Sequence, residues 1–284
     1  MHALPLALAT LIAVALAPAL LRAMAQGGHV QGNYRGRRLP FPLGVLIPLA
    51  AAISLVPLML IARLAPASIF RPEIVPVTIY CFGIAVLGLI DDTLGGGETP
   101  PGSQRRPRRG WRGHGAAVLR GELSTGALKA AGSLGLALLA VDALERSNGR
   151  WLLGAAVLVL ATNVFNLLDL RPGRAIKVFV ALGAGLAIGS GQVRTLWTLG
   201  LLAGPALVAG AYDLRERAML GDTGSNLLGA LAGLWLVLTL SGTGQAIALG
   251  LLLAITVYGE LRSISALIER TPGLRELDSW GRPS

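Results

Sequence analysis

Long apolar runs separated by short polar segments are the feature that most limits what this chain can fold into. Nine runs lie at residues 2–24, 40–64, 74–90, 124–145, 151–168, 175–190, 194–212, 221–240 and 245–264. Most of them approach the roughly 20 residues that a helix needs to cross a bilayer. Only 14% of the residues are charged, whereas a soluble domain has about 25%. The sequence therefore predicts an all-α, polytopic helical membrane protein with about nine transmembrane helices.

The distribution of lysine and arginine predicts the orientation. If all nine runs cross the membrane, 20 of the 25 basic residues fall on one side. Such an excess is typical of the cytoplasmic side. No basic residue precedes the first run, so we expect a retained helix and not a signal peptide. We therefore expect the N-terminus outside and the C-terminus in the cytoplasm.

The chain reads as one membrane domain over residues 1–284, with no internal repeat. Residues 95–115 are rich in glycine, proline and arginine and predict a basic cytoplasmic loop that contains the isolated His114. Residues 265–284 form a predicted cytoplasmic tail, and the stretch 261–277 could be an interfacial amphipathic helix. The net charge of +10 is explained by cytoplasmic loops, so no nucleic-acid partner is expected. One cysteine and three histidines argue against a disulfide framework and a zinc site.

Aspartates gather at the ends of the runs on the predicted cytoplasmic side. Asp91 and Asp92 end the third run, Asp169 ends the fifth, and Asp222 opens the eighth. Two adjacent carboxylates at a helix C-terminus repel each other and oppose the helix dipole. A bound divalent cation would relieve that repulsion, although a solvated helix end is the alternative. Asp213 ends the seventh run, and we expect it to be an ordinary helix-end residue that tolerates asparagine.

Polar side chains within the runs extend this pattern. Asn163, Asn166 and Asp169 are spaced by three residues, which places them on one stripe of a helix. Asn226 lies one turn after Asp222 and shares its side of the helix. These residues could line a binding site, or they could make hydrogen bonds between helices.

Four basic residues are candidate phosphate ligands. Arg171, Arg174 and Lys177 repeat every three residues and could clamp a diphosphate or anchor a helix end. Lys129 lies inside the fourth run, where it could pair with a phosphate or extend its amine toward the membrane surface.

The segments Leu89–Asp92, Asn163–Asp169 and Gly221–Ser225, in this order, resemble the polyprenyl-phosphate N-acetylhexosamine-1-phosphate transferases. This superfamily includes the phospho-N-acetylmuramoyl-pentapeptide transferase of peptidoglycan synthesis. The resemblance implies a Mg²⁺-dependent enzyme of the bacterial cytoplasmic membrane, active at its cytoplasmic face. The enzyme would transfer a phospho-sugar from a UDP-sugar to polyprenyl (undecaprenyl) phosphate and release UMP.

The resemblance also implies residue roles. Asp91, Asp92 and Asp169 match catalytic or nucleotide-site acids, and one of the pair would deprotonate the lipid phosphate or attack directly. Asp222, with Asp91, matches the metal site. Lys129 and Asn166 match substrate-binding positions, beside the candidates Asn163, Arg171, Arg174, Lys177 and Asn226. Residues 35–44 resemble the family's basic loop.

The chain departs from the family at two places. Pro172 stands where the family has a second aspartate, and no histidine follows His114, although the family has a late histidine cluster. The alternative is therefore a catalytically silent relative that binds polyprenyl phosphate or a partner enzyme. A transporter is less favoured because the charges lie at the ends of the runs and not at the bilayer midplane. A homodimer is left open.

Overall fold

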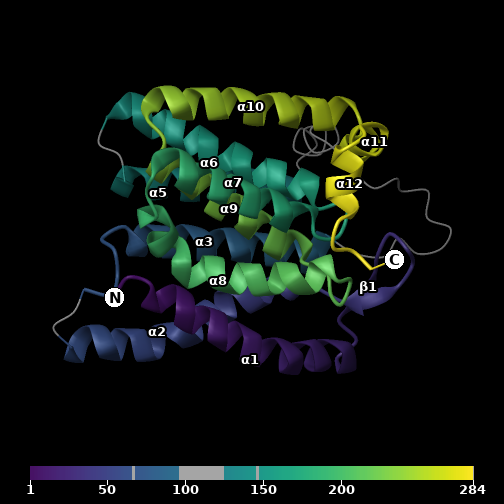
Figure 1. Cartoon of the computed structure of the whole chain (residues 1–284), viewed down its shortest axis with the longest axis horizontal. Coiled ribbons are helices and arrows are strands. Elements are labelled where there is room, and N and C mark those ends of the chain that lie inside the picture. Colours follow the sequence, from purple (N-terminus) through teal and green to yellow (C-terminus); the bar gives the residue numbers. More distant parts are fainter. Residues whose placement is uncertain (66–67, 96–124, 145–146, 284) are drawn as a thin grey trace.

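The structure, a computed structural model, describes residues 1–65, 68–95, 125–144 and 147–283. Its long helices follow the apolar runs of the sequence. They are α1 (Leu4–Gln26), α2 (Leu46–Leu64), α3 (Ile74–Ile90), α5 (Thr125–Leu144), α6 (Asn148–Leu168), α7 (Arg174–Ser190), α8 (Arg194–Leu214), α9 (Gly221–Thr239) and α10 (Gly242–Leu261). The helices lie side by side along one direction (Figure 1).

Seven of the described helices are long and apolar enough to cross a membrane. Helices α7 and α9 do not meet that standard: α7 has 17 residues, and α9 begins with the polar stretch Gly221–Asn226. The chain is an all-α protein of multi-pass membrane type. The number of nine crossings and the sides of the two termini stay predictions.

Small elements gather at one end of the bundle, on the right in Figure 1. A hairpin of β1 (Val30–Gly32) and β2 (Arg38–Pro40) pairs antiparallel, with Gln31 opposite Leu39. A 3₁₀ turn, η1 (Leu43–Val45), precedes α2, and a π-helical turn, η2 (Asp91–Gly95), follows α3. The short helices α11 (Ile264–Arg270) and α12 (Leu274–Ser279) follow α10. The predicted loop 95–115, with His114, lies outside the described residues except for Gly95.

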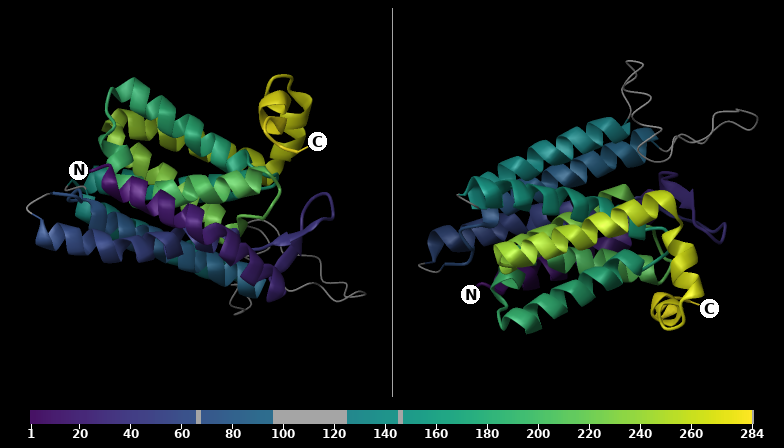
Figure 2. Two further views of the ribbon diagram at one scale, coloured as in Figure 1. Left: turned by 60° about the horizontal axis from the view of Figure 1, so that its bottom comes forward. Right: turned by 90° about the horizontal axis from the view of Figure 1, so that it is seen from above.

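Helix α9 is the centre of the bundle. It packs against α3, α6, α7 and α8; Figure 2 shows the bundle from two further sides. Every residue from Thr223 to Val237 is buried. A side chain at Gly229 would lie 2.6 Å from the Cα of Thr162, and one at Gly233 would lie 3.1 Å from the Cα of Leu158. Small residues let membrane helices approach closely, so these glycines hold α9 firmly against α6.

This packing brings the chain ends of several helices together. The end of α3, the end of α6, the end of α8 and the start of α9 all lie at the end of the bundle that carries the hairpin and the C-terminal helices (Figure 1). These are the positions where the sequence places its aspartates, and the contacts between them define the candidate site.

Candidate active site

Asp222, in the first turn of α9, is the meeting point of four helices. Lys129 of α5 contacts the carboxylates of Asp222 and Asp91, with 3.2 Å between its Nζ and Asp91 Oδ2. From α6, the Asn166 amide donates to Asp222 Oδ2 at 2.9 Å and to Asn226 Oδ1 at 3.0 Å. The side chains of Lys129, Asp91 and Asp222 keep 18%, 23% and 33% of their surface exposed. Hydrogen bonds and ion pairs hold this group in place, and three of its members remain partly exposed. It is called the acidic cluster below and consists of Asp91, Lys129, Asn166, Asp222 and Asn226.

Asp92 points to a different partner than Asp91 does. Its Oδ1 accepts from the backbone N–H of Asp222 at 2.8 Å, and its Oδ2 accepts from the N–H and the hydroxyl of Thr223 at 2.8 and 2.6 Å. Asp92 therefore caps the start of α9, where free N–H groups attract negative charge. This position suits a residue that aims Asp222, and it differs from the substrate-facing position expected from the sequence. Thr223 lies in the Gly221–Ser225 motif, but the sequence does not indicate that it would bind Asp92.

Glycines allow the chain around Asp222 to pack backbone against backbone. The Gly44 N–H donates to the carbonyl of Leu220 at 2.9 Å. A side chain at Gly224 would lie 3.1 Å from Gly44 Cα, and one at Gly88 would lie 2.6 Å from the backbone oxygen of Asp222. The basic segment 35–44 thus supports the start of α9, and these glycines serve close packing of the protein itself.

Asp213 is a structural tie and not the tolerant helix-end residue expected from the sequence. It is 4% exposed. Its carboxylate accepts from the N–H groups of Gly173 at 2.7 Å and Leu220 at 3.4 Å. It thereby joins the loop after α6 to the loop before α9. Residue types alone do not indicate this role, because both donors are backbone groups that lie outside α8.

Asp169 directly follows α6, near the carboxylates of Asp213, Asp222 and Asp92. It is half-buried. Desolvation, followed by the negative charges of Asp213, Asp222 and Asp92, raises the pKa of Asp169 well above its ordinary value, and Arg174 offsets this only in part. Burial and the neighbouring carboxylates therefore disfavour ionisation of Asp169.

Asn163 does not join the acidic cluster. Its amide donates to the hydroxyl of Thr256 on α10 at 3.2 Å, while Asn166 faces α9. Three residues advance a helix by about 300°, so successive members of the stripe differ by roughly 60° in direction. That drift is enough to turn Asn163 toward a different neighbour.

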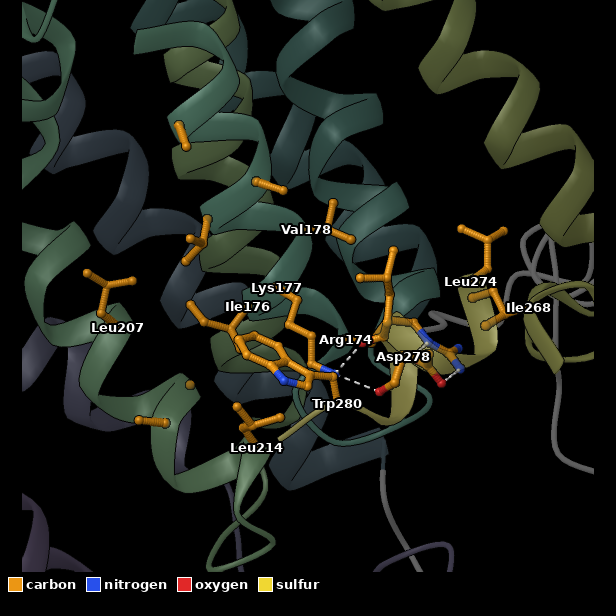
Figure 3. A pocket seen from close by; sticks show the side chains of 16 residues that line it. Arg174, Ile176, Lys177, Val178, Leu207, Leu214, Ile268, Leu274, Asp278 and Trp280 are labelled. Atoms are coloured by element: carbon orange, nitrogen blue, oxygen red, sulfur yellow. Dashed lines mark hydrogen bonds and ion pairs between the residues drawn. The ribbon is translucent and has the colours of Figure 1, made fainter. Parts of the chain in front are cut away.

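The three basic residues at the start of α7 contact the C-terminal segment. Arg171 Nη2 lies 2.8 Å from Glu269 Oε1. Arg174 donates hydrogen bonds to both carboxylate oxygens of Asp278 at 2.8 and 3.0 Å. Lys177 donates to the backbone carbonyls of Leu277 and Asp278. Figure 3 shows Arg174 and Lys177 directed toward Asp278. In this structure these cations bind the C-terminal segment, which fits the alternative role of anchoring a helix end, and the diphosphate clamp stays a prediction.

The acidic cluster offers the donor set that Mg²⁺ uses. Mg²⁺ prefers oxygen ligands and is commonly held by one or two protein carboxylates together with waters and substrate phosphates. Asp91 and Asp222 each present an oxygen to the same ammonium group, so both can reach one cation. The oxygens of Asp92 are taken up by α9. Within the described ranges no group of three or more acidic, histidine or cysteine side chains forms a complete metal cage.

Comparison of the chain with models of known protein families finds no match, and a search of curated proteins finds none either.

Proposed function

We propose that this protein is a Mg²⁺-dependent transferase that moves a phospho-sugar from a UDP-sugar to polyprenyl phosphate and releases UMP. The observation that supports it most is the convergence of three separate chain segments on Asp222. Asp91 comes from the end of α3, Asn166 from the end of α6, and Lys129 from α5. We place this site at the cytoplasmic face of a bacterial inner membrane, where a soluble nucleotide sugar and a membrane lipid can meet.

The chemistry of the two substrates suits the cluster. In the transfer, an oxygen of the lipid phosphate forms a bond to the sugar-bearing phosphorus of the UDP-sugar. The bond from that phosphorus to the UMP oxygen breaks, and UMP leaves with the electron pair. Asp222 and Asp91 are the residues to hold Mg²⁺, which when bound would neutralise the crowded phosphate charges. Lys129 adds a fixed positive charge beside them.

The amides near Asp222 would orient the substrates. Asn166 holds the Asp222 carboxylate from one side and contacts Asn226 from the other. The Asn226 Nδ2 is buried and has no hydrogen-bond partner in the described part of the chain. A buried donor without a partner is costly, and a polar substrate group would remove that cost. Asp92 acts as a positioning residue because it fixes the first turn of α9.

A catalytically silent relative is the second candidate. Pro172 occupies the place of an acid in the related transferases, and Arg174 and Lys177 are engaged by the tail. Such a protein would bind polyprenyl phosphate or a partner enzyme without transferring anything.

A transfer assay separates the two candidates. Purified protein with undecaprenyl phosphate, Mg²⁺ and a panel of radiolabelled UDP-sugars should convert label to a lipid-soluble product. We expect transfer from some UDP-sugar other than UDP-MurNAc-pentapeptide, because the metal-side acids Asp91 and Asp222 are retained while the loop at Pro172 is altered. Asp91→Asn should abolish the product. Absence of transfer from every UDP-sugar, in detergent and in liposomes, would favour the silent relative.

A further inference from the structure

An apolar groove lies between α7 and α8, away from the acidic cluster. Its volume is about 630 Å³, within the range typical of small-molecule sites. The C-terminal segment closes one end of it, as Figure 3 shows. Its described lining residues include none of the acidic cluster.

Small residues make up part of the groove's lining. They are Ala181 and Ala184 of α7 and Gly210 and Ala211 of α8. Larger side chains form its outer edges, among them Val178, Val180 and Leu207, which are 37%, 48% and 41% exposed. In a membrane protein an apolar surface of this kind faces hydrocarbon. We therefore expect the groove to open toward the lipid.

The end of the groove at the C-terminal segment is amphipathic. Trp280 is 73% exposed, and its ring lies beside Ile176, Leu214 and Lys177 in Figure 3. Tryptophan is enriched at the level of lipid headgroups. This end of the groove therefore has the character of a membrane–water boundary.

The same end carries a cation, Lys177, beside an ion-paired cluster. Arg174 and Arg282 both bind the carboxylate of Asp278, whereas Lys177 donates to backbone carbonyls at 2.9 and 2.6 Å. Among the described residues no carboxylate lies within ion-pairing distance of the Lys177 amine, so its charge can meet an anion. Lys177 has three N–H donors and is only partly buried, so it can also reach an incoming anion.

We propose that this groove binds one acyl chain of an anionic glycerophospholipid from the surrounding bilayer, with the lipid phosphate at Lys177 and Trp280 at headgroup level. Basic pockets between membrane helices are suited to anionic headgroups, and the apolar lining accepts the chain. The site assigns Lys177 to a lipid phosphate at the edge of the protein. It does not depend on the proposed transfer reaction.

Native mass spectrometry of the full-length protein in mild detergent tests the site. Phosphatidylglycerol and phosphatidylcholine with the same acyl chains are added separately. The protein should retain one phosphatidylglycerol, with phosphatidylcholine at least about 10-fold weaker, the effect of one good charge-assisted contact. Lys177→Gln should remove most of that preference.

Filling the groove provides the second arm of the test. Ala184 is exposed on α7, so Ala184→Phe should fold normally and lose the retained lipid, and Ala211→Phe is a second variant of the same kind. Leu251→Phe on α10, at a site 62% exposed, is the matched control and should retain it. Equal retention of both lipids, or unchanged retention by a folded Ala184→Phe, would overturn the site. Displacement of the phospholipid by lower concentrations of polyprenyl phosphate would assign the groove to the substrate lipid and also overturn it.

Discussion

Two carboxylate clusters lie at the same end of this bundle, and their electrostatics are opposite. Around Asp278, the guanidinium groups of Arg174 and Arg282 outweigh the effect of burial and lower the pKa of that carboxyl to about 2. Around Asp222, the acids act on one another, and burial with neighbouring carboxylates raises the pKa of Asp169. The first cluster is balanced by the protein's own cations. The second has two carboxylates, Asp91 and Asp222, that share one ammonium group. Perturbed pKa values such as that of Asp169 often occur at functional sites.

The largest effect should come from removing a charge from the second cluster. Asp91→Asn should lower the transfer rate at least about 10²-fold, the scale for losing a key electrostatic stabiliser. Its melting temperature should change little, because the lost contact with Lys129 and the relieved repulsion from Asp222 act in opposite directions. Asp142→Asn is the matched control, since Asp142 is exposed near the other end of α5 from Lys129. Equal rates for the two variants would break the comparison.

The balanced cluster should respond in stability and not primarily in chemistry. Asp278→Asn should cost about 2–3 kcal/mol, the worth of hydrogen bonds to charged groups, because Arg174, with a side chain 4% exposed, loses its partner. Limited proteolysis of the C-terminal segment measures the release. Glu269→Gln is the control: its side chain is 54% exposed, and a surface pair contributes about 0–1 kcal/mol.

The pH dependence of this cluster follows from the sign of the shift. The pKa of Asp278 is lower in the folded protein than its ordinary value, so the pair contributes fully above about pH 4 and is lost as the pH falls toward 2. Protease sensitivity of the tail should rise over that interval in the wild type. Asp278→Asn should be sensitive already at neutral pH, and resistance of the variant there would show that the tail is held by other contacts.

A smaller effect is expected at Asp213, which joins the loop after α6 to the loop before α9. Asp213→Asn replaces one acceptor oxygen by an N–H₂ group that faces a backbone donor. The variant should be destabilised by about 1–3 kcal/mol, the cost of leaving a buried group unsatisfied. Thermal unfolding in detergent measures it. A melting temperature equal to that of the wild type would restore the role first expected of a helix-end residue.

Sequence reasoning located the helices well and their partners poorly. The run 175–190 corresponds to α7 (Arg174–Ser190), because composition and length decide where an apolar helix begins and ends. Sequence reasoning did not show that α9, with its polar first turn, is the most buried of the described helices. Burial in a bundle depends on the shape of neighbours, here the glycine contacts with α6, and not on hydropathy alone.

The site was anticipated in its residues more than in its arrangement. The prediction grouped Asp91, Asp222, Asn166 and Lys129, and the contacts join them. It could not separate Asp91 from Asp92, because which of two neighbours reaches the α9 backbone is decided by the turn η2. It also could not tell which anion Arg174 and Lys177 would meet, since the C-terminal segment lies about 100 residues along the chain.

The initial rate of transfer against Mg²⁺ concentration, for the wild type and for Asp222→Asn, tests the central claim most directly. Asp222 stands at the junction of α3, α5, α6 and α9, and we propose that it ligates the cation. The variant should lose at least about 10²-fold in rate and need more Mg²⁺ for half-maximal rate, while Asp142→Asn matches the wild type in both. A folded Asp222→Asn protein with a near-normal rate and an unchanged Mg²⁺ requirement would contradict the assignment of the acidic cluster as the active site.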